Sequence, residues 1–157
     1  MKRVVDVVIV GAGIAGLATT VALKKVGVRA LVMEKSKGLR STGTALTLSP
    51  DDWLALDALG VSHKLIPPLH SFIQDNSPFR LSSKLGAIES QEHGSDASIP
   101  VVYLEDETKI KSEVLIGCDG VHSAVARWLG LADQPFHAGR SAVYQLYMDL
   151  NETFFIG

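Results

Sequence analysis

The sequence predicts an α/β fold in which a parallel sheet begins with a strand–helix–strand unit and includes a small antiparallel β-meander. A β-branched run over residues 4–10 ends at a glycine-rich turn, and a helical pattern and a second apolar strand follow within about 30 residues. Further along, two strand patterns stand close together on either side of a turn. With 157 residues, of which 46% are hydrophobic and 20% charged, the chain has the composition of one globular domain.

The strand–helix–strand unit is the best marked part of the chain. Residues 4–10 read VVDVVIV, which is typical of a strand buried in a parallel sheet. Residues 14–26 have helical spacing and end at Gly27, and residues 29–33 form a second short apolar strand that ends at Glu34. The order of these patterns predicts one right-handed βαβ unit.

A second helix is predicted to begin at Ser49 and Pro50. Serine caps a helix N-terminus, and proline suits the first helical position. This helix is expected to end at Gly60, since glycine commonly follows the last helical turn. The pattern then weakens over residues 67–83, where three prolines and Asn76 act as breakers.

The rest of the predicted fold is a small meander and a short helix. Residues 87–93 and 99–105 read as strands. Residues 109–111 are expected to pair with the second of them after a turn at Asp106 and Glu107. Residues 114–116 form a separate short buried strand in this prediction. Ser123 then caps a helix that ends near Trp128.

The turn after the first strand carries a G-x-G-x-x-G motif. Gly11 permits the tight turn, Gly13 lets the backbone approach a pyrophosphate, and Gly16 allows close packing of helix and strand. The helix N-terminus then offers free N–H groups and a positive partial charge to phosphates. The candidate cofactor-binding residues of this turn are Gly11, Ala12, Gly13, Ile14, Ala15 and Gly16.

Glu34, at the end of the second strand, is the expected partner of this turn. A carboxylate there accepts hydrogen bonds from the adenosine ribose and repels a 2′-phosphate, so NADP is a poor candidate for this site. The neighbouring Lys35 joins the candidate cofactor-binding residues. FAD and NAD share the ADP moiety, so the motif leaves both open, and the alternative reading is a glycine-rich turn with a surface glutamate.

A second motif, Asp119-Gly120 within residues 114–123, narrows the choice. Together with the glycine turn it resembles the single-component FAD-dependent monooxygenases typified by para-hydroxybenzoate and salicylate hydroxylases, and residues 43–50 and 117–131 look closest to the plant FAD-dependent monooxygenases. The resemblance implies a partial Rossmann-type FAD-binding domain. It adds the candidate cofactor-binding residues Arg40, Asp119, Gly120 and Ser123. The alternative reading of Asp119-Gly120 is a turn between a strand and a helix.

The resemblance also implies an activity. In such enzymes NADH or NADPH is the co-substrate that reduces FAD, and one oxygen atom of O2 reaches a small, often aromatic substrate through a flavin hydroperoxide. The cofactor performs this chemistry while the protein orients it. Such a reaction therefore needs no side-chain nucleophile or acid–base pair. The sequence shows no convincing one, so the catalytic residues are unknown.

The chain is expected to cover only part of a protein of this family. Residues 1–157 are expected to form a single incomplete FAD/NAD(P)-binding domain, without the substrate-binding domain and the C-terminal part. A truncated chain of this kind predicts weak FAD binding, uncoupled NAD(P)H oxidation, and an uncovered apolar face. It also predicts association through an exposed sheet edge.

Two other functions compete with the monooxygenase. The first is a noncatalytic nucleotide-binding or interaction fragment of such an enzyme. The second is an NAD-dependent dehydrogenase, for which no recognisable catalytic constellation is present. A net charge of −2 argues against nucleic acid, one cysteine and no ligand spacing argue against a metal site, and the lack of a long apolar run predicts no transmembrane segment and a cytoplasmic protein.

Overall fold

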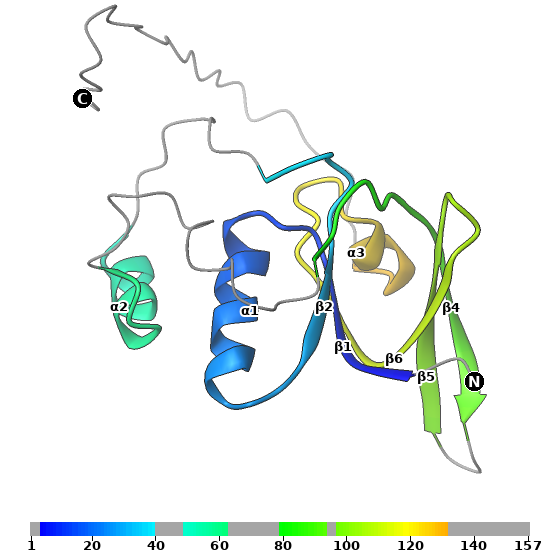
Figure 1. The fold of residues 1–157 in the computed structure, drawn as a ribbon, viewed down its shortest axis with the longest axis horizontal. Coiled ribbons are helices and arrows are strands. Elements are labelled where there is room, and N and C mark those ends of the chain that lie inside the picture. Colours follow the sequence, from blue (N-terminus) through cyan, green and yellow to red (C-terminus); the bar gives the residue numbers. More distant parts are fainter. Residues whose placement is uncertain (1–3, 40–48, 63–78, 94–96, 132–157) are drawn as a thin grey trace, which may run out of the picture.

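The computed structural model describes residues 4–39, 49–62, 79–93 and 97–131. One sheet contains the described strands in the order β3-β2-β1-β6-β5-β4 (Figure 1). The elements are β1 (Val4–Val10), α1 (Ile14–Lys25), β2 (Ala30–Met33), α2 (Pro50–Ala58), β3 (Phe79–Arg80), β4 (Leu85–His93), β5 (Ala97–Leu104), β6 (Lys109–Gly117) and α3 (Ala124–Trp128).

Strand β1 lies at the centre of the parallel half of the sheet. It pairs in parallel with β2, where Val10 is opposite Met33, and with β6, where Val10 is opposite Gly117. Val8 and Ile9 are completely buried, which explains why nearly every residue of this strand is apolar. The bounds predicted for the first strand are confirmed, and those of the first helix and second strand differ by one residue.

Strand β6 has two different partners. Lys109–Lys111 pair antiparallel with β5, and from Lys111 to Gly117 the same strand pairs in parallel with β1. The prediction of two separate strands here was wrong. Ser112 and Glu113 interrupt the apolar pattern, but backbone pairing needs no apolar side chain, so the strand continues through them.

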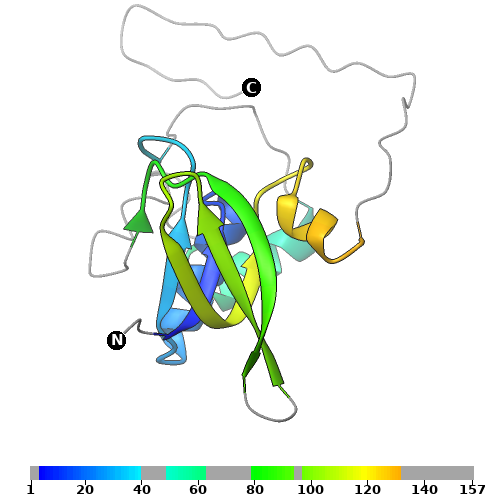
Figure 2. The ribbon, with the colours of Figure 1, turned by 90° about the vertical axis from the view of Figure 1, so that its right-hand side faces the viewer.

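Two hydrophobic cores cover the two faces of this sheet. On one face, Val7, Ile9, Ala30 and Val32 pack with the partly buried Leu23 of α1. On the other face the meander and α3 close over the parallel strands, and Figure 2 shows β4 and β5 in front of them. The buried residues of this second core are Val8, Val10, Met33, Val102, Leu104, Ile110 and Val125. The apolar face expected to be uncovered is therefore covered at β1 and β2.

Strand β3 is an element that the sequence did not predict. Its two residues, Phe79 and Arg80, pair in parallel with Val32 and Met33 of β2. They lie in the region where breakers weakened the pattern, and so short a strand exists only through its partner. Among the described residues β3 and β4 are the two edges of the sheet.

The caps of the later two helices match the sequence prediction. The Ser49 side chain accepts from the Asp52 N–H, and the Asp52 carboxylate accepts from the Ser49 N–H, which completes a capping box on α2. Ser123 caps α3 by accepting from the Ala126 N–H at 2.9 Å. None of the helices in the described ranges is long and apolar enough to cross a membrane.

Candidate functional site

The glycine turn leaves β1 at the carboxyl end of the parallel strands. Gly11 has φ +98°, a conformation that favours glycine, and its N–H donates to the Met33 carbonyl at 2.7 Å. A Cβ built on Gly11 would overlap the carbonyl oxygen of Cys118. The fold itself therefore requires glycine at this position.

Gly13 differs from Gly11 because nothing in the described chain demands it. Its φ of −74° suits any residue, and a Cβ built on it would meet no atom within 4 Å. Gly13 is the N-cap of α1, makes no side-chain cap, and is followed by no acidic residue in the first turn. The N–H groups at the exposed start of α1 and the positive end of the helix dipole form a cradle that suits a pyrophosphate.

The carboxylate of Glu34 lies directly beside this cradle. Its Oε2 accepts from the Ala12 N–H and its Oε1 from the Ser36 N–H, each at 2.8 Å. The structure thus brings Glu34 to the glycine turn, as the sequence spacing suggested. Lys35 lies next to it with an exposed side chain, while Arg40 falls outside the described residues.

The second motif follows β6 at the same end of the sheet. The Cys118 N–H donates to the Val10 carbonyl at 2.7 Å, and Gly117 packs against the Val125 side chain. The carboxylate of Asp119 accepts from the Ser123 hydroxyl at 2.5 Å and from the Ala124 N–H at 2.6 Å. Asp119 therefore holds the start of α3, which is the structural role of a turn aspartate.

The segment beyond Asp119 faces solvent. Gly120 has φ +83°, a Cβ on it would meet no described atom within 4 Å, and Val121 is 97% exposed. The Arg127 guanidinium donates to the carbonyl of His122 at 2.9 Å and so braces this loop from α3. A cofactor role for Asp119 and Gly120 stays a prediction.

Cys118 is the packing residue between the two motifs. Its carbonyl lies against Gly11, and its Cβ would lie 3.4 Å from a Cβ on Gly16. Burial raises the pKa of the Cys118 thiol, although a hydrogen bond with Thr19 works in the opposite direction. The thiol is therefore protonated at neutral pH and acts as a small packing group.

Sequence reasoning missed one residue at this site, Arg80. Its carbonyl accepts from the Glu34 N–H at 3.0 Å, and its guanidinium bonds to the turn between β5 and β6. No local pattern marks such a residue, because its partners come from distant segments. Among the described residues no group of three or more His, Cys, Asp or Glu side chains is placed to hold a metal ion.

The chain resembles known proteins in sequence and in fold. Residues 4–71 match the family described as "FAD binding domain". "Monooxygenase 2" and "Monooxygenase 1" of Arabidopsis thaliana are each 32% identical to the chain, over 88% and 87% of its length. The chain spans 42% and 43% of the length of these two relatives.

A similar fold is found in an aklavinone-11 hydroxylase, solved as a ternary complex with FAD and aklavinone. That structure superimposes with a TM-score of 0.68 over 83% of this chain and 36% of its own, at 21% sequence identity. The segment that matches this family begins with β1 and contains the glycine turn and Glu34, which together build the cradle. Residues 4–71 therefore match an FAD-binding domain, and most of the chain is similar in sequence to part of two plant monooxygenases.

Proposed function

We propose that this chain provides the FAD site of an NAD(P)H-dependent monooxygenase that transfers one oxygen atom of O2 to a small aromatic substrate. The observation that carries the proposal is the open space at Gly13 with the Glu34 carboxylate beside it. The names of the two plant relatives support the reaction class.

In this proposal each part of the glycine turn has a separate task. The N–H groups of residues 13–16 bind the pyrophosphate at the positive end of α1. Glu34 accepts hydrogen bonds from the adenosine ribose and disfavours a 2′-phosphate at that point. For this, the ribose hydroxyls must share or replace the Ala12 N–H at the Glu34 carboxylate.

The second motif provides the neighbouring wall of the site. Asp119 holds the loop at Gly120 in place through α3, and the loop lies at the same end of the sheet as the glycine turn. Bound FAD supplies the redox chemistry between NAD(P)H, O2 and the substrate. The backbone N–H groups of the glycine turn and the Glu34 side chain bind and orient it, and Cys118 stays a neutral packing group.

The visible absorption spectrum of the purified chain, before and after incubation with excess FAD and desalting, tests this proposal. Retained flavin bands, weakened in a Glu34→Ala variant, are the expected result. Oxidation of NADH and of NADPH is then followed with and without candidate aromatic substrates. A wild-type chain that takes up no flavin contradicts the proposal and favours the noncatalytic interaction fragment, which size-exclusion chromatography would reveal as self-association.

A further inference from the structure

We propose that Arg80 is a positioning residue for the nucleotide site, through which the turn between β5 and β6 holds Glu34 in place. The inference rests on the proposed FAD site and adds a residue to it. Within the described part of the chain the Arg80 side chain bonds to Ser83, Asp106 and Thr108, so its effect on the glycine turn passes through the backbone that carries Glu34.

The backbone on either side of Glu34 is joined to the segment after β3. The Glu34 N–H donates to the Arg80 carbonyl at 3.0 Å, and the Ser83 N–H donates to the Glu34 carbonyl at 2.8 Å. The Ser82 N–H donates to the Ser36 carbonyl at 3.0 Å. Both hydrogen-bonding groups of the Glu34 backbone are therefore satisfied by the segment that begins at Arg80.

This segment needs an anchor. Ser82 has φ +52°, which is uncommon for a residue other than glycine and costs conformational free energy. Among the described residues the two residues of β3 have a single partner strand, at Val32 and Met33, so strand pairing alone holds this segment weakly.

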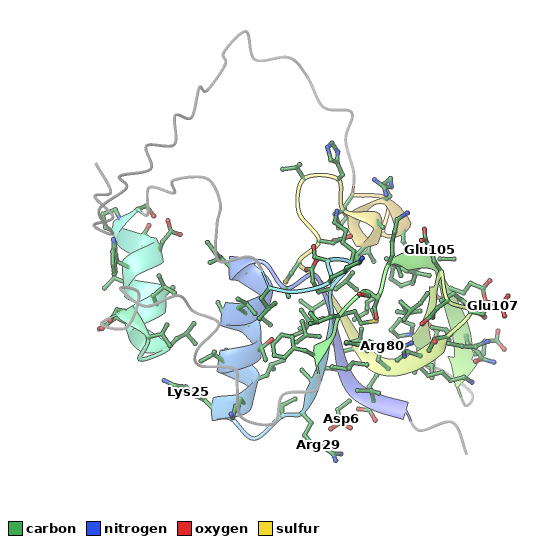
Figure 3. The ribbon with its side chains drawn as sticks, turned by 45° about the horizontal axis from the view of Figure 1, so that its top comes forward. Asp6, Lys25, Arg29, Arg80, Glu105 and Glu107 are labelled. Carbon is green, nitrogen blue, oxygen red and sulfur yellow. The ribbon has the colours of Figure 1, made fainter. Side chains whose placement is uncertain are left out.

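The Arg80 side chain supplies the anchor. Its Nη2 donates to Asp106 Oδ2 and to Thr108 Oγ1, both at 2.7 Å, and its Nε donates to Ser83 Oγ at 3.1 Å. Figure 3 shows Arg80 beside the turn that carries Glu105 and Glu107. One guanidinium thus joins the turn to Ser83, whose N–H in turn holds Glu34. Arginine suits this task because it presents several donors in a fixed plane.

Lys84 provides a matched control from the same segment. Its Nζ forms an ion pair with Glu105 at 2.7 Å, but both side chains are more than half exposed. Within the described residues this ion pair joins Lys84 to Glu105 and does not involve Ser83 or Glu34. The Lys84 carbonyl accepts from the Glu105 N–H, and a side-chain substitution leaves that bond in place.

The test compares wild type, Arg80→Met, Arg80→Lys and Lys84→Met in two measurements. Calorimetric titration with ADP probes the pyrophosphate and adenosine ribose contacts, and titration with FMN is the control ligand that lacks the adenosine. Amide hydrogen exchange of the ligand-free protein reports on Ser83, Ser36 and Ala12, whose N–H groups donate to Glu34.

We expect Arg80→Met to weaken ADP binding about tenfold, with Arg80→Lys between it and wild type. FMN binding and the Lys84→Met variant should match wild type. Exchange at Ser83, Ser36 and Ala12 should accelerate in Arg80→Met before any global unfolding. Asp106→Asn should weaken ADP binding in the same way, and combining it with Arg80→Met should add little, because both remove one interaction.

The outcomes separate this inference from the proposed function. A wild-type chain that binds neither FAD nor ADP contradicts the proposed site and with it the role of Arg80 there. A wild-type chain that binds ADP, with Arg80→Met binding equally well, overturns the role of Arg80 alone. Equal losses in Arg80→Met and Lys84→Met also overturn it, since they would indicate a general effect of charge or stability.

Discussion

The α-carbon of Gly16 faces the carbonyl oxygen of Gly11 so closely that a β-carbon on Gly16 would overlap that oxygen. Gly16 is buried in the first turn of α1, and the Gly11 backbone that it faces is itself held by Met33. Neither side has a flexible side chain that can move away. Helix α1 and the turn below it are thus fitted to each other at this contact.

Gly16→Ala should therefore reduce the stability of the fold, whereas Gly13→Ala should reduce FAD binding. We expect Gly16→Ala to lower the free energy of unfolding by about 1–3 kcal/mol through overpacking. Gly13→Ala should leave it within about 1 kcal/mol of wild type, because its φ suits alanine and its Cβ meets open space. Gly13→Ala should nevertheless weaken FAD binding about tenfold or more. Urea denaturation and flavin titration of both variants measure these effects.

The comparison has a clear contrary result. If Gly13→Ala binds FAD as tightly as wild type, no phosphate group approaches this backbone, and the cradle is only a turn. If Gly16→Ala is as stable as wild type, the turn moves to admit a methyl group.

Asp119 is predicted to act on stability even without cofactor. Asp119→Ala removes the acceptor of the Ser123 hydroxyl and of the Ala124 N–H, and we expect it to lower the free energy of unfolding by about 1–2 kcal/mol. Asp119→Asn, which keeps one side-chain oxygen, should cost less. Denaturation of the flavin-free protein measures both. Unchanged stability in Asp119→Ala would show that α3 does not depend on this carboxylate.

Ser112 offers a route to a more stable chain. Its side chain is fully buried in β6, and its Oγ has no hydrogen-bond partner among the described residues. Ser112→Ala should raise the free energy of unfolding by about 1 kcal/mol, because it removes an unsatisfied hydroxyl. Ser83→Ala is the control: Ser83 is also buried, but its hydroxyl bonds to Arg80 and Leu81, so its loss should destabilise. Thermal unfolding of both variants measures these changes in stability, and a destabilised Ser112→Ala variant would contradict the prediction.

Stability should fall at acid pH through Asp106. Hydrogen bonds from the Thr108 hydroxyl and N–H, together with the nearby Arg80 guanidinium, hold the pKa of Asp106 below its usual 3.8. The folded state therefore favours the carboxylate, so this contribution is present above the unfolded pKa and is lost as pH falls through the lowered value. Asp106→Asn should show a shallower decline between about pH 5 and pH 2 when its unfolding free energy is compared with that of wild type. Parallel declines would contradict the assignment.

Much of this structure could be predicted because its determinants are local in sequence. The β-branched run of β1 and the Ser49 and Ser123 caps each identify an element within a few residues. Glu34 was found for a related reason: a strand that follows a glycine turn by one helix must end beside that turn.

The remainder depends on contacts between distant segments. Phe79 and Arg80 form a strand only because β2 lies beside them, and no two-residue pattern predicts that. The hydrogen bonds of Arg80 to Asp106 and Thr108 arise from the fold as a whole. The sequence equally left open whether Asp119 serves a ligand or a turn, and its bonds to Ser123 and Ala124 became visible only in three dimensions.

The double pairing of β6 has a consequence for the timing of folding. The first of the described strands, β1, obtains one of its two neighbours only when residues 111–117 have been made, and the Val10 carbonyl is bonded only once Cys118 is present to donate its N–H. Contacts so distant in sequence slow folding, because a long stretch of chain must lose conformational entropy before these contacts contribute any favourable free energy. On the ribosome the glycine turn therefore emerges early, but the contacts with β6 and Cys118 that support it form late, after most of the described chain has left the exit tunnel.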